Sequence, residues 1–181
     1  MSHETPKSWT VVRIAGEKSW AAAVSGEAIS VEDMIDRRED GYEIDMDEGR
    51  IDVALVHHWL STDAFWALGR DRETVERSMA GSLNFGIYDG LGNQVAYARV
   101  VTDLATFAWL CDVYVDRAHR GFGLGVWLAS AVRDHLAPYR LKRVLLSTLD
   151  AHELYEKVGF VPFPDPEKLM ILAQEDGAGA M

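Results

Sequence analysis

The stretch CDVYVDRAHRGFGLGVWLASAVRDHL, residues 111–136, carries the most specific pattern in the sequence. Apolar residues alternate at its start, which is typical of a β-strand. Arg120 and glycines at positions 121, 123 and 125 interrupt the strand, and apolar residues then recur at helical spacing. Glycine permits positive φ and leaves the backbone amides uncovered, while the first amides of a helix lack partners within the helix. The stretch therefore predicts a strand, a loop that binds phosphate or pyrophosphate, and a helix over about 123–137.

Two well-known nucleotide-binding loops do not fit these glycines. A P-loop requires Lys-Ser or Lys-Thr after its last glycine, and neither follows here. A Rossmann loop requires a third glycine near the position of Trp127 and a preceding βαβ unit. The other alternative is a tight turn from strand to helix without a ligand, and the glycines alone do not decide between the turn and a binding site.

The flanking segments predict an α+β domain. Two β-type runs surround DGLGN at 89–93, a sequence typical of a hairpin, and a third strand is predicted over 105–116. Upstream, a helix is predicted behind an Asp52 cap and a second helix is predicted to end near Gly81. The downstream prediction is a strand over 142–149, a short helix over 151–159 and a last strand over 168–173.

The N-terminal residues are harder to interpret. The pattern allows a short strand over 9–16, a helix opened by Ser30 over 30–40, and a strand ending in a turn over 41–51. We therefore divide the chain into three parts. An N-terminal extension, packed on the domain or appended to it, covers 1–40, the main domain covers 41–174, and a disordered tail covers 175–181.

Composition limits the function. The chain has 181 residues, 48% of them hydrophobic, which fits one domain with a full core. Its single cysteine, Cys111, excludes an intrachain disulfide and a Cys-rich zinc site, so no metal site is expected. The N-terminus carries no signal peptide pattern and no apolar run reaches membrane-spanning length, which predicts a cytoplasmic protein without a membrane partner. The net charge of −11 argues against a general nucleic-acid binder. It is compatible with a cationic small-molecule partner, but on this evidence alone solubility is the better explanation.

Two motifs together resemble the GNAT superfamily of acyl-CoA-dependent N-acetyltransferases. The superfamily pattern [QR]-x-x-G-x-[GA] after a central strand is met by Arg120, Gly123 and Gly125. A second pattern, A-x-x-[LF]-Y-x-x-x-G-F, is met by Ala151, Leu154, Tyr155, Gly159 and Phe160. The resemblance covers roughly residues 82–163. It implies a mixed, mostly antiparallel sheet that is flanked by helices and splayed at the cofactor-binding strand, often by a β-bulge.

The resemblance also implies acetyl-CoA as cofactor, with CoA as product. The backbone of the central strand would pair with the pantetheine arm at Val113, Tyr114 and Val115. The pyrophosphate would lie on the loop formed by Arg120, Gly121, Phe122, Gly123, Leu124, Gly125 and Val126. Thr148 stands where many relatives carry asparagine, which leaves a side-chain contact to the cofactor open there.

Acetyl transfer to an amine needs a proton donor for the leaving thiolate and a base for the amine. Tyr155 matches the tyrosine that faces the CoA sulfur in the superfamily, and the alternative for it is a core aromatic. For the base we place Asp112 first, with His152 and Asp103 as alternatives; many relatives use water instead.

The resemblance leaves the acceptor open, because this fold serves many amines. We expect it near the first two helices and near 102–103 and 148–150, with five candidate contacts: Trp59, Trp66, Asp103, Asp150 and His152. For the aromatic residues, core packing is the alternative. Acids expected near the thioester (Asp103, Asp112 and Asp150) favour a small primary amine with a second positive charge. The sequence thus predicts an N-acetyltransferase for a small-molecule amine, with a non-catalytic acetyl-CoA sensor as the alternative; a homodimer is compatible with either.

Overall fold

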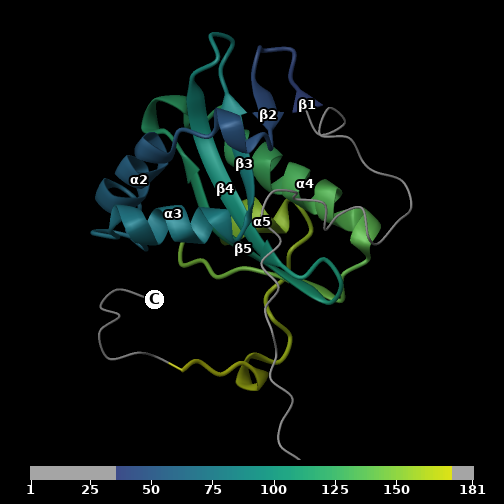
Figure 1. Cartoon of the computed structure of the whole chain (residues 1–181). Coiled ribbons are helices and arrows are strands. Elements are labelled where there is room, and N and C mark those ends of the chain that lie inside the picture. The colour runs from purple at the N-terminus through teal and green to yellow at the C-terminus, as the bar shows by residue number, and fades with distance from the viewer. Residues whose placement is uncertain (1–35, 173–181) are drawn as a thin grey trace, which may run out of the picture. The chain divides into compact units, whose positions relative to one another are not determined.

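A six-stranded sheet in the order β1-β2-β3-β4-β5-β6 organises the computed structural model, which describes residues 36–172 (Figure 1). All neighbouring strands are antiparallel except β5 and β6, which are parallel. The mixed, mostly antiparallel sheet is therefore confirmed. The strands are β1 Asp36–Arg37, β2 Glu43–Asp45, β3 Leu83–Tyr88, β4 Gln94–Thr102, β5 Phe107–Val115 and β6 Arg143–Leu145.

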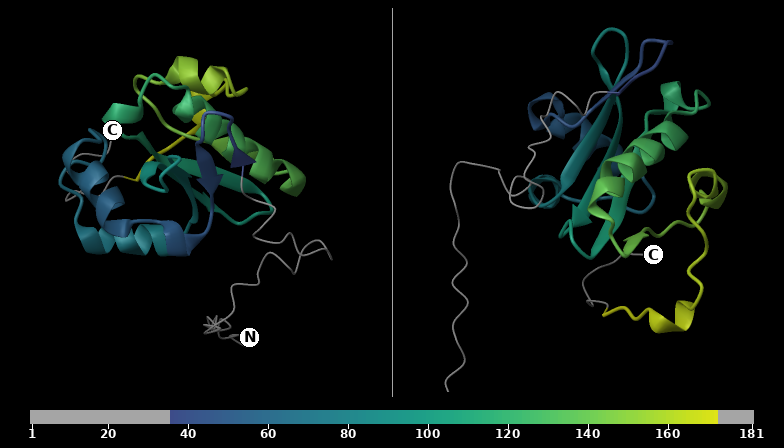
Figure 2. Two further views of the ribbon diagram at one scale, coloured as in Figure 1. Left: turned by 90° about the horizontal axis from the view of Figure 1, so that it is seen from above. Right: turned by 90° about the vertical axis from the view of Figure 1, so that its right-hand side faces the viewer.

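Helices cover both faces of the sheet (Figure 2). On one face lie α2, Val53–Thr62, and α3, Arg72–Ala80; on the other lie α4, Leu124–Leu136, and α5, His152–Glu156. The side chain of Asp52 accepts a hydrogen bond from the Leu55 amide, as the predicted cap requires, and Gly81 follows the last residue of α3. Short 3-10 turns cover Glu48–Arg50, Arg117–His119, Ala137–Tyr139 and Pro166–Lys168. None of the helices between residues 36 and 172 has both the length and the apolar character needed to cross a membrane.

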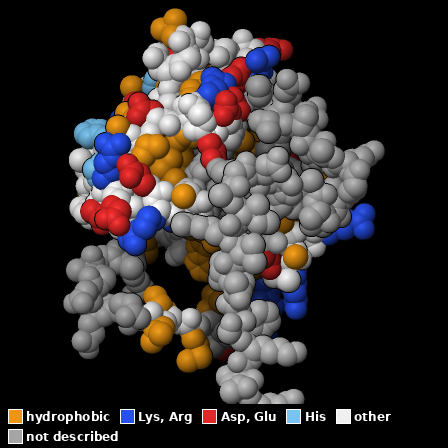
Figure 3. Space-filling model, in the orientation of Figure 1, with side chains coloured by type: hydrophobic (Ala, Val, Ile, Leu, Met, Phe, Trp, Pro, Cys, Tyr) orange, Lys and Arg blue, Asp and Glu red, His pale blue; other side chains and the backbone are white. Residues whose placement is uncertain are grey.

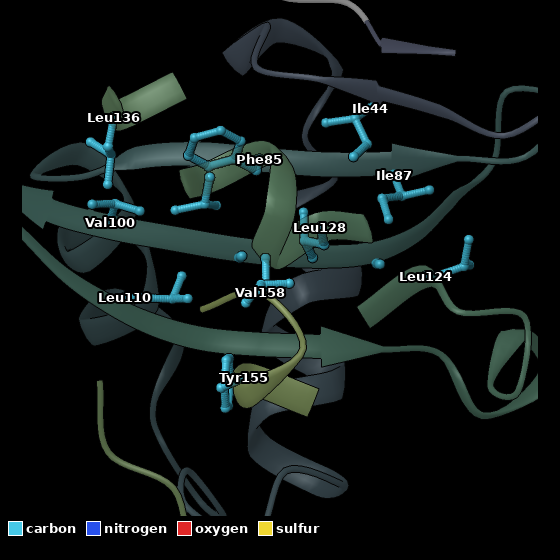
Figure 4. Close-up of a cluster of buried hydrophobic side chains, with 14 of the residues drawn as sticks. Ile44, Phe85, Ile87, Val100, Leu110, Leu124, Leu128, Leu136, Tyr155 and Val158 are labelled. Atoms are coloured by element: carbon cyan, nitrogen blue, oxygen red, sulfur yellow. The ribbon is translucent and has the colours of Figure 1, made fainter. Parts of the chain in front are cut away.

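Two hydrophobic clusters hold these layers together. The larger one joins the sheet to α4 and α5, and Figure 4 shows Phe85, Val100 and Leu110 facing the helices. The smaller one joins α2 and α3 to the opposite face, where Tyr97 and Tyr114 are buried. Side chains alternate between the two faces along a strand, and an irregularity in the pairing of β4 and β5 shifts this alternation, so that Leu110 and Tyr114 face opposite sides of the sheet.

A β-bulge in the pairing of β4 with β5 lies just beyond the point where β5 stops pairing with β6. Tyr97 pairs with Tyr114 but Arg99 pairs with Cys111, so β5 carries one residue more than β4 between these pairs. Asp112, within the extra stretch, has a φ of 50°. The ladder between β5 and β6 covers only Phe107–Trp109 on the β5 side. The predicted splay is therefore confirmed, and it leaves one edge of residues 110–115 without a strand partner in the described part of the chain.

Two strands predicted near the C-terminus differ from the structure. The strand predicted over 168–173 is wrong, because residues 169–172 form no strand; prolines at 162, 164 and 166 cannot donate ladder hydrogen bonds just before them. The hydrophobic side chains of this C-terminal segment are largely exposed (Figure 3), with Met170 at 98%. The strand predicted over 142–149 is shorter, at Arg143–Leu145.

The N-terminal predictions are tested only in part. Strand 9–16, residues 30–35 of the helix predicted over 30–40, and the tail 175–181 lie outside the described residues. Asp36–Arg37 form a strand rather than a helix, because they pair with β2 across the turn at Gly41, whose φ is 90°. The sheet therefore begins by Asp36, within the segment assigned to the extension.

Candidate active site

The glycine loop lies between the end of β5 and the start of α4. Gly121 and Gly123 have φ angles of 85° and 74°, which other residues rarely adopt. Gly123 is the N-cap of α4 and has no side chain to bond the first amides of the helix. A Cβ atom at either glycine would meet nothing within 4 Å. The loop thus leaves the first amides of α4 without a side-chain cap and has open space beside its glycines, an arrangement suited to an anionic group.

Gly125 serves a different purpose from the other two loop glycines. A Cβ atom at Gly125 would lie 2.8 Å from Cδ1 of Leu154. Glycine at this position therefore allows the first turn of α4 to approach α5 closely. The purely structural interpretation of the loop holds for this residue, whereas Gly121 and Gly123 shape the exposed path of the backbone.

The hairpin formed by β1 and β2 contacts the glycine loop. Arg38 Nη1 donates to the carbonyl oxygen of Phe122 at 3.0 Å, and the Tyr42 hydroxyl bonds Nδ1 of His119 at 2.8 Å. The Trp127 indole of α4 donates to Asp36 Oδ2 at 2.8 Å. Sequence reasoning missed these contacts, because their partners are separated by 77 to 91 residues and no motif links them.

Asp63, directly after α2, connects this helix to the approach to the loop. Its carboxylate accepts hydrogen bonds from the Tyr114 hydroxyl at 2.6 Å, from Arg117, and from Arg120 Nη2 at 3.1 Å. The Arg117 bond first and the Tyr114 bond second hold the pKa of Asp63 well below its usual range. Arg120 also donates to the carbonyl of Val115 at 2.9 Å, so it fixes the path of the chain into the loop.

Replacing Asp63 with asparagine is expected to lower the melting temperature at pH 7, because the charged partner of the two arginines is lost. A carboxyl group whose folded-state pKa is lowered stabilises the fold above its unfolded pKa, near 4, and loses this contribution as the pH falls. The difference between wild type and variant should therefore shrink from pH 5 toward pH 2 in thermal melts. Asp134→Asn, which removes an exposed pair with Arg133, is the control. A difference independent of pH would contradict an ionic role for Asp63.

A cleft of about 270 Å³ lies beside β6 and α5, close to the splay. Tyr155 lines it, with 9% of its surface exposed, and its ring packs edge-on against Phe160 at 5.8 Å. Burial first, and the charge of Asp150 second, raise the pKa of Tyr155 to about 12. Within the described residues its hydroxyl has no hydrogen-bonding partner. Its ring belongs to the core, as Figure 4 shows, while the residue also reaches the cleft.

Two other predicted residues lie at the same cleft. Thr148 accepts a hydrogen bond from the Ala151 amide at 3.1 Å and so supports the start of α5. His152 is exposed and lines the cleft, whereas Asp150 is exposed just before α5.

The side chains of the predicted cofactor strand and loop differ in burial. On β5, the side chains of Val113 and Val115 pack partly against the larger cluster. Tyr114 stacks on Trp59 with ring centroids 5.2 Å apart. In the loop, the Leu124 side chain is buried, Val126 is half-buried, and Phe122 is 55% exposed.

Asp112 does not stand free in the site. Its side chain is 3% exposed, and its Oδ2 atom accepts hydrogen bonds from Arg99 Nε at 2.6 Å and from Arg70 Nη1 at 2.8 Å. Both guanidinium groups bond the same carboxylate oxygen, so this side chain is occupied in holding Arg70 and Arg99 together. The geometry therefore favours a structural role for Asp112 over the predicted role of base.

The predicted cluster of acids near the thioester is not assembled. Asp103 lies in the turn between β4 and β5, at the opposite end of β5 from the glycine loop, where it accepts hydrogen bonds from the amides of residues 105–107. Asp112 is neutralised by arginines. For Trp59 the core-packing alternative is correct, since it is 5% exposed. Trp66 is half-buried with its ring edge-on to Phe65.

Comparison with known proteins agrees with this geometry. The sequence matches the model of the acetyltransferase (GNAT) family over residues 53–160, more than half of the chain. A crystal structure of a candidate GNAT acetyltransferase from Xanthomonas campestris pv. campestris is 41% identical and has a TM-score of 0.69. The match covers 74% of this chain and 93% of that one.

Two further proteins extend the comparison. A candidate acetyltransferase of Gibberella zeae is 29% identical over 77% of this chain and 91% of its own length. A candidate acetyltransferase of Deinococcus radiodurans R1, 19% identical over 81% of this chain and 97% of its own, shares the fold with a TM-score of 0.59. The chain therefore belongs to the GNAT family and is an N-acetyltransferase.

Proposed function

We propose that the protein transfers the acetyl group of acetyl-CoA to a primary amine by direct attack of the amine on the thioester. The observation that carries this proposal is the open edge of residues 110–115, which runs between the glycine loop and the cleft that Tyr155 lines. Five residues of extended chain, 111–115, span about 13 Å. This length suits an extended pantetheine arm paired with the strand backbone, as an added strand would be.

The described residues fit acetyl-CoA in this orientation. The first amides of α4 have no side-chain cap, and the Cβ positions of Gly121 and Gly123 border open space, so these amides would hold the pyrophosphate. Backbone groups of Val113, Tyr114 and Val115 on the open edge of β5 would pair with the pantetheine amides. When bound, acetyl-CoA supplies the thioester whose acetyl group passes to the amine and whose sulfur leaves as a thiol.

Tyr155 is the group we assign to the leaving sulfur. Because the pKa of its phenol is raised to about 12, the hydroxyl stays protonated throughout the neutral range and can donate a hydrogen bond. The same raised pKa makes complete proton transfer less favourable than from an ordinary phenol. We therefore assign to Tyr155 the stabilisation of developing negative charge, with the proton moving as the carbon–sulfur bond breaks.

The amine must lose a proton before or during its attack. Asp112 is engaged with Arg70 and Arg99, so we assign this proton to another acceptor. His152 is exposed at the cleft beside Tyr155 and offers a ring nitrogen that can accept the proton, with bulk water as the alternative acceptor. The choice can be tested with His152→Gln, which should lower kcat only if the imidazole accepts the proton.

A thermal-shift panel with acetyl-CoA, NAD and ATP, followed by detection of free CoA with a thiol reagent, tests the proposal. At 100 times its dissociation constant, acetyl-CoA should stabilise the fold by about 2.7 kcal/mol, a rise of roughly 5–10 °C in melting temperature. NAD and ATP should give little shift. An unchanged melting temperature with saturating acetyl-CoA would contradict the proposal, and binding without CoA release to any amine would favour the sensor instead.

A further inference from the structure

A cluster with excess positive charge lies on the face of the sheet that carries α2 and α3. Arg70, just before α3, and Arg99, on β4, both bond the same oxygen of Asp112 on β5. Among residues 36–172, Asp112 is the only carboxylate that either arginine contacts. Two guanidinium groups therefore share one carboxylate, and the cluster formed by Arg70, Arg99 and Asp112 keeps a net charge of about +1, because arginine stays protonated.

This excess charge is largely removed from water. The side chains of Arg70 and Arg99 are only 22% and 14% exposed. A charge that is partly buried without a matching partner costs free energy, so such clusters are normally balanced. In the described part of the chain, Arg70 Nε and Nη2 donate to no protein group, and Arg99 keeps Nη2 free after bonding Asp112 and Ser82. These donors form an incomplete set suited to an oxyanion.

The cluster lies where the proposed thioester would end. Asp112 belongs to the β-bulge, and its left-handed φ of 50° is unusual for a residue other than glycine. Backbone strain of this kind persists where the surrounding structure fixes it, and bulges re-aim side chains at functional sites. A pantetheine arm that starts at the glycine loop and follows β5 would bring its sulfur close to residues 111–112. An acceptor held by Arg70 and Arg99 would then reach the acetyl group from the side of α2 and α3.

We propose that Arg70 and Arg99 form an anion subsite for the acceptor, so that the amine substrate also carries a carboxylate or phosphate group. This inference rests on the proposed function and deepens it by naming the chemical class of the acceptor. It takes the place of the second positive charge expected from the sequence, since the acids behind that expectation do not gather at the bulge. Asp112 holds the two guanidinium groups side by side, so it is a positioning residue.

Matched pairs of amines test the subsite with acetyl-CoA and wild-type protein. Leucine is compared with leucinamide for the carboxylate, phosphoethanolamine with ethanolamine for the phosphate, and putrescine serves as the dication. Charge-assisted hydrogen bonds predict that kcat/KM, expressed per free amine, is roughly tenfold or more higher for at least one anionic member than for the partner that lacks the anionic group. Whichever pair shows the preference identifies the anion.

Variants then locate the preference. Arg70→Gln leaves the Arg99–Asp112 pair intact and should abolish the preference, mainly through KM for the amine, while Arg70→Lys should retain part of it. The matched control is Arg72→Gln, which removes the same charge from the exposed surface of α3, where Arg72 pairs with Glu76. The acetyl-CoA thermal shift should persist in all three variants. If Arg70→Gln fails to fold, the ratio of kcat/KM between the two members of each amine pair, measured with wild-type protein, decides the question alone.

Three outcomes would overturn the subsite. The first is a kcat/KM for putrescine, or for the amines that lack the anionic group, that equals or exceeds the kcat/KM of the anionic amines. The second is a preference for the anionic amines that Arg70→Gln leaves intact. The third is an equal loss of this preference in Arg70→Gln and Arg72→Gln. The first of these, with CoA still released, leaves the proposed function standing. If no amine releases CoA, the proposed function itself is contradicted and the acceptor subsite falls with it.

Discussion

Replacing Tyr155 with phenylalanine is expected to lower kcat about 100-fold, the low end of the range for general acid catalysis. The low end applies because burial raises the pKa of the phenol to about 12, so the hydroxyl acts more by hydrogen bonding than by complete proton transfer. Phenylalanine keeps the ring and its edge-on contact with Phe160. We therefore expect an almost unchanged dissociation constant for acetyl-CoA and an unchanged melting temperature. Steady-state kinetics together with titration calorimetry separate these quantities.

Tyr139→Phe is the matched control, since it removes a phenolic hydroxyl from the turn after α4, away from the cleft. It should leave kcat unchanged. In the wild-type protein the phenol of Tyr155 stays protonated far above neutrality. Its ionisation should therefore cause no fall in kcat/KM between pH 6 and 9. Near-normal turnover of Tyr155→Phe would show that the ring only packs in the core and that another group or water protonates the sulfur.

Replacing Gly123 with alanine is expected to weaken acetyl-CoA binding about 100-fold, the equivalent of losing one or two charge-assisted hydrogen bonds. No protein atom lies within 4 Å of the added methyl group, so the loss would come from the ligand and from the backbone. The methyl group would occupy the space where the pyrophosphate approaches the first amides of α4. The strained φ of 74° would also shift those amides.

The fold can be separated from binding with Gly92→Ala. Gly92 lies in the exposed turn between β3 and β4, has a φ of 83°, and also has open space around its Cβ position. Each substitution should therefore add about 1–2 kcal/mol of backbone strain to the folded state. The two variants should show a similar fall in melting temperature. Only Gly123→Ala should lose acetyl-CoA affinity in calorimetry. Equal affinity in the two variants would show that the loop glycine is needed only for the turn.

The parts of the site that the sequence predicts correctly are encoded by neighbouring residues. A strand, glycines and a helix start follow one another within residues 111–136, and each leaves its own local pattern. The Asp52 cap and the end of α3 at Gly81 are equally local. Helix caps, glycine turns and helix starts depend on residues a few positions apart. The order of residues is therefore sufficient to predict these elements.

The charged groups of the site illustrate what a single sequence does not reveal. Asp63 lies 51 residues before Tyr114, and Arg70 lies 42 residues before Asp112. Only the sheet order and the packing of α2 and α3 bring these partners together, and each residue alone looks like an ordinary surface charge. In the sequence alone Asp112 therefore fits the role of a base, because its two arginine partners are not apparent there.

The prediction of a C-terminal strand is wrong for a related reason. The apolar run over 168–173 fits a buried strand by composition, but a strand exists only where a neighbour pairs with it. In the structure β6 pairs with β5, and residues 169–172 join no ladder. Composition predicts the tendency to form a strand, whereas pairing depends on partners that the pattern does not specify.

Amide hydrogen exchange with and without saturating acetyl-CoA can show whether acetyl-CoA lies along β5 from the glycine loop to the cleft lined by Tyr155. We expect slower exchange in peptides covering residues 113–126, with no change in the turn at 103–106 at the other end of β5 and no such protection by ATP. Unchanged exchange in residues 113–126 under conditions where acetyl-CoA is bound, or protection confined to other parts of the chain, would contradict this expectation.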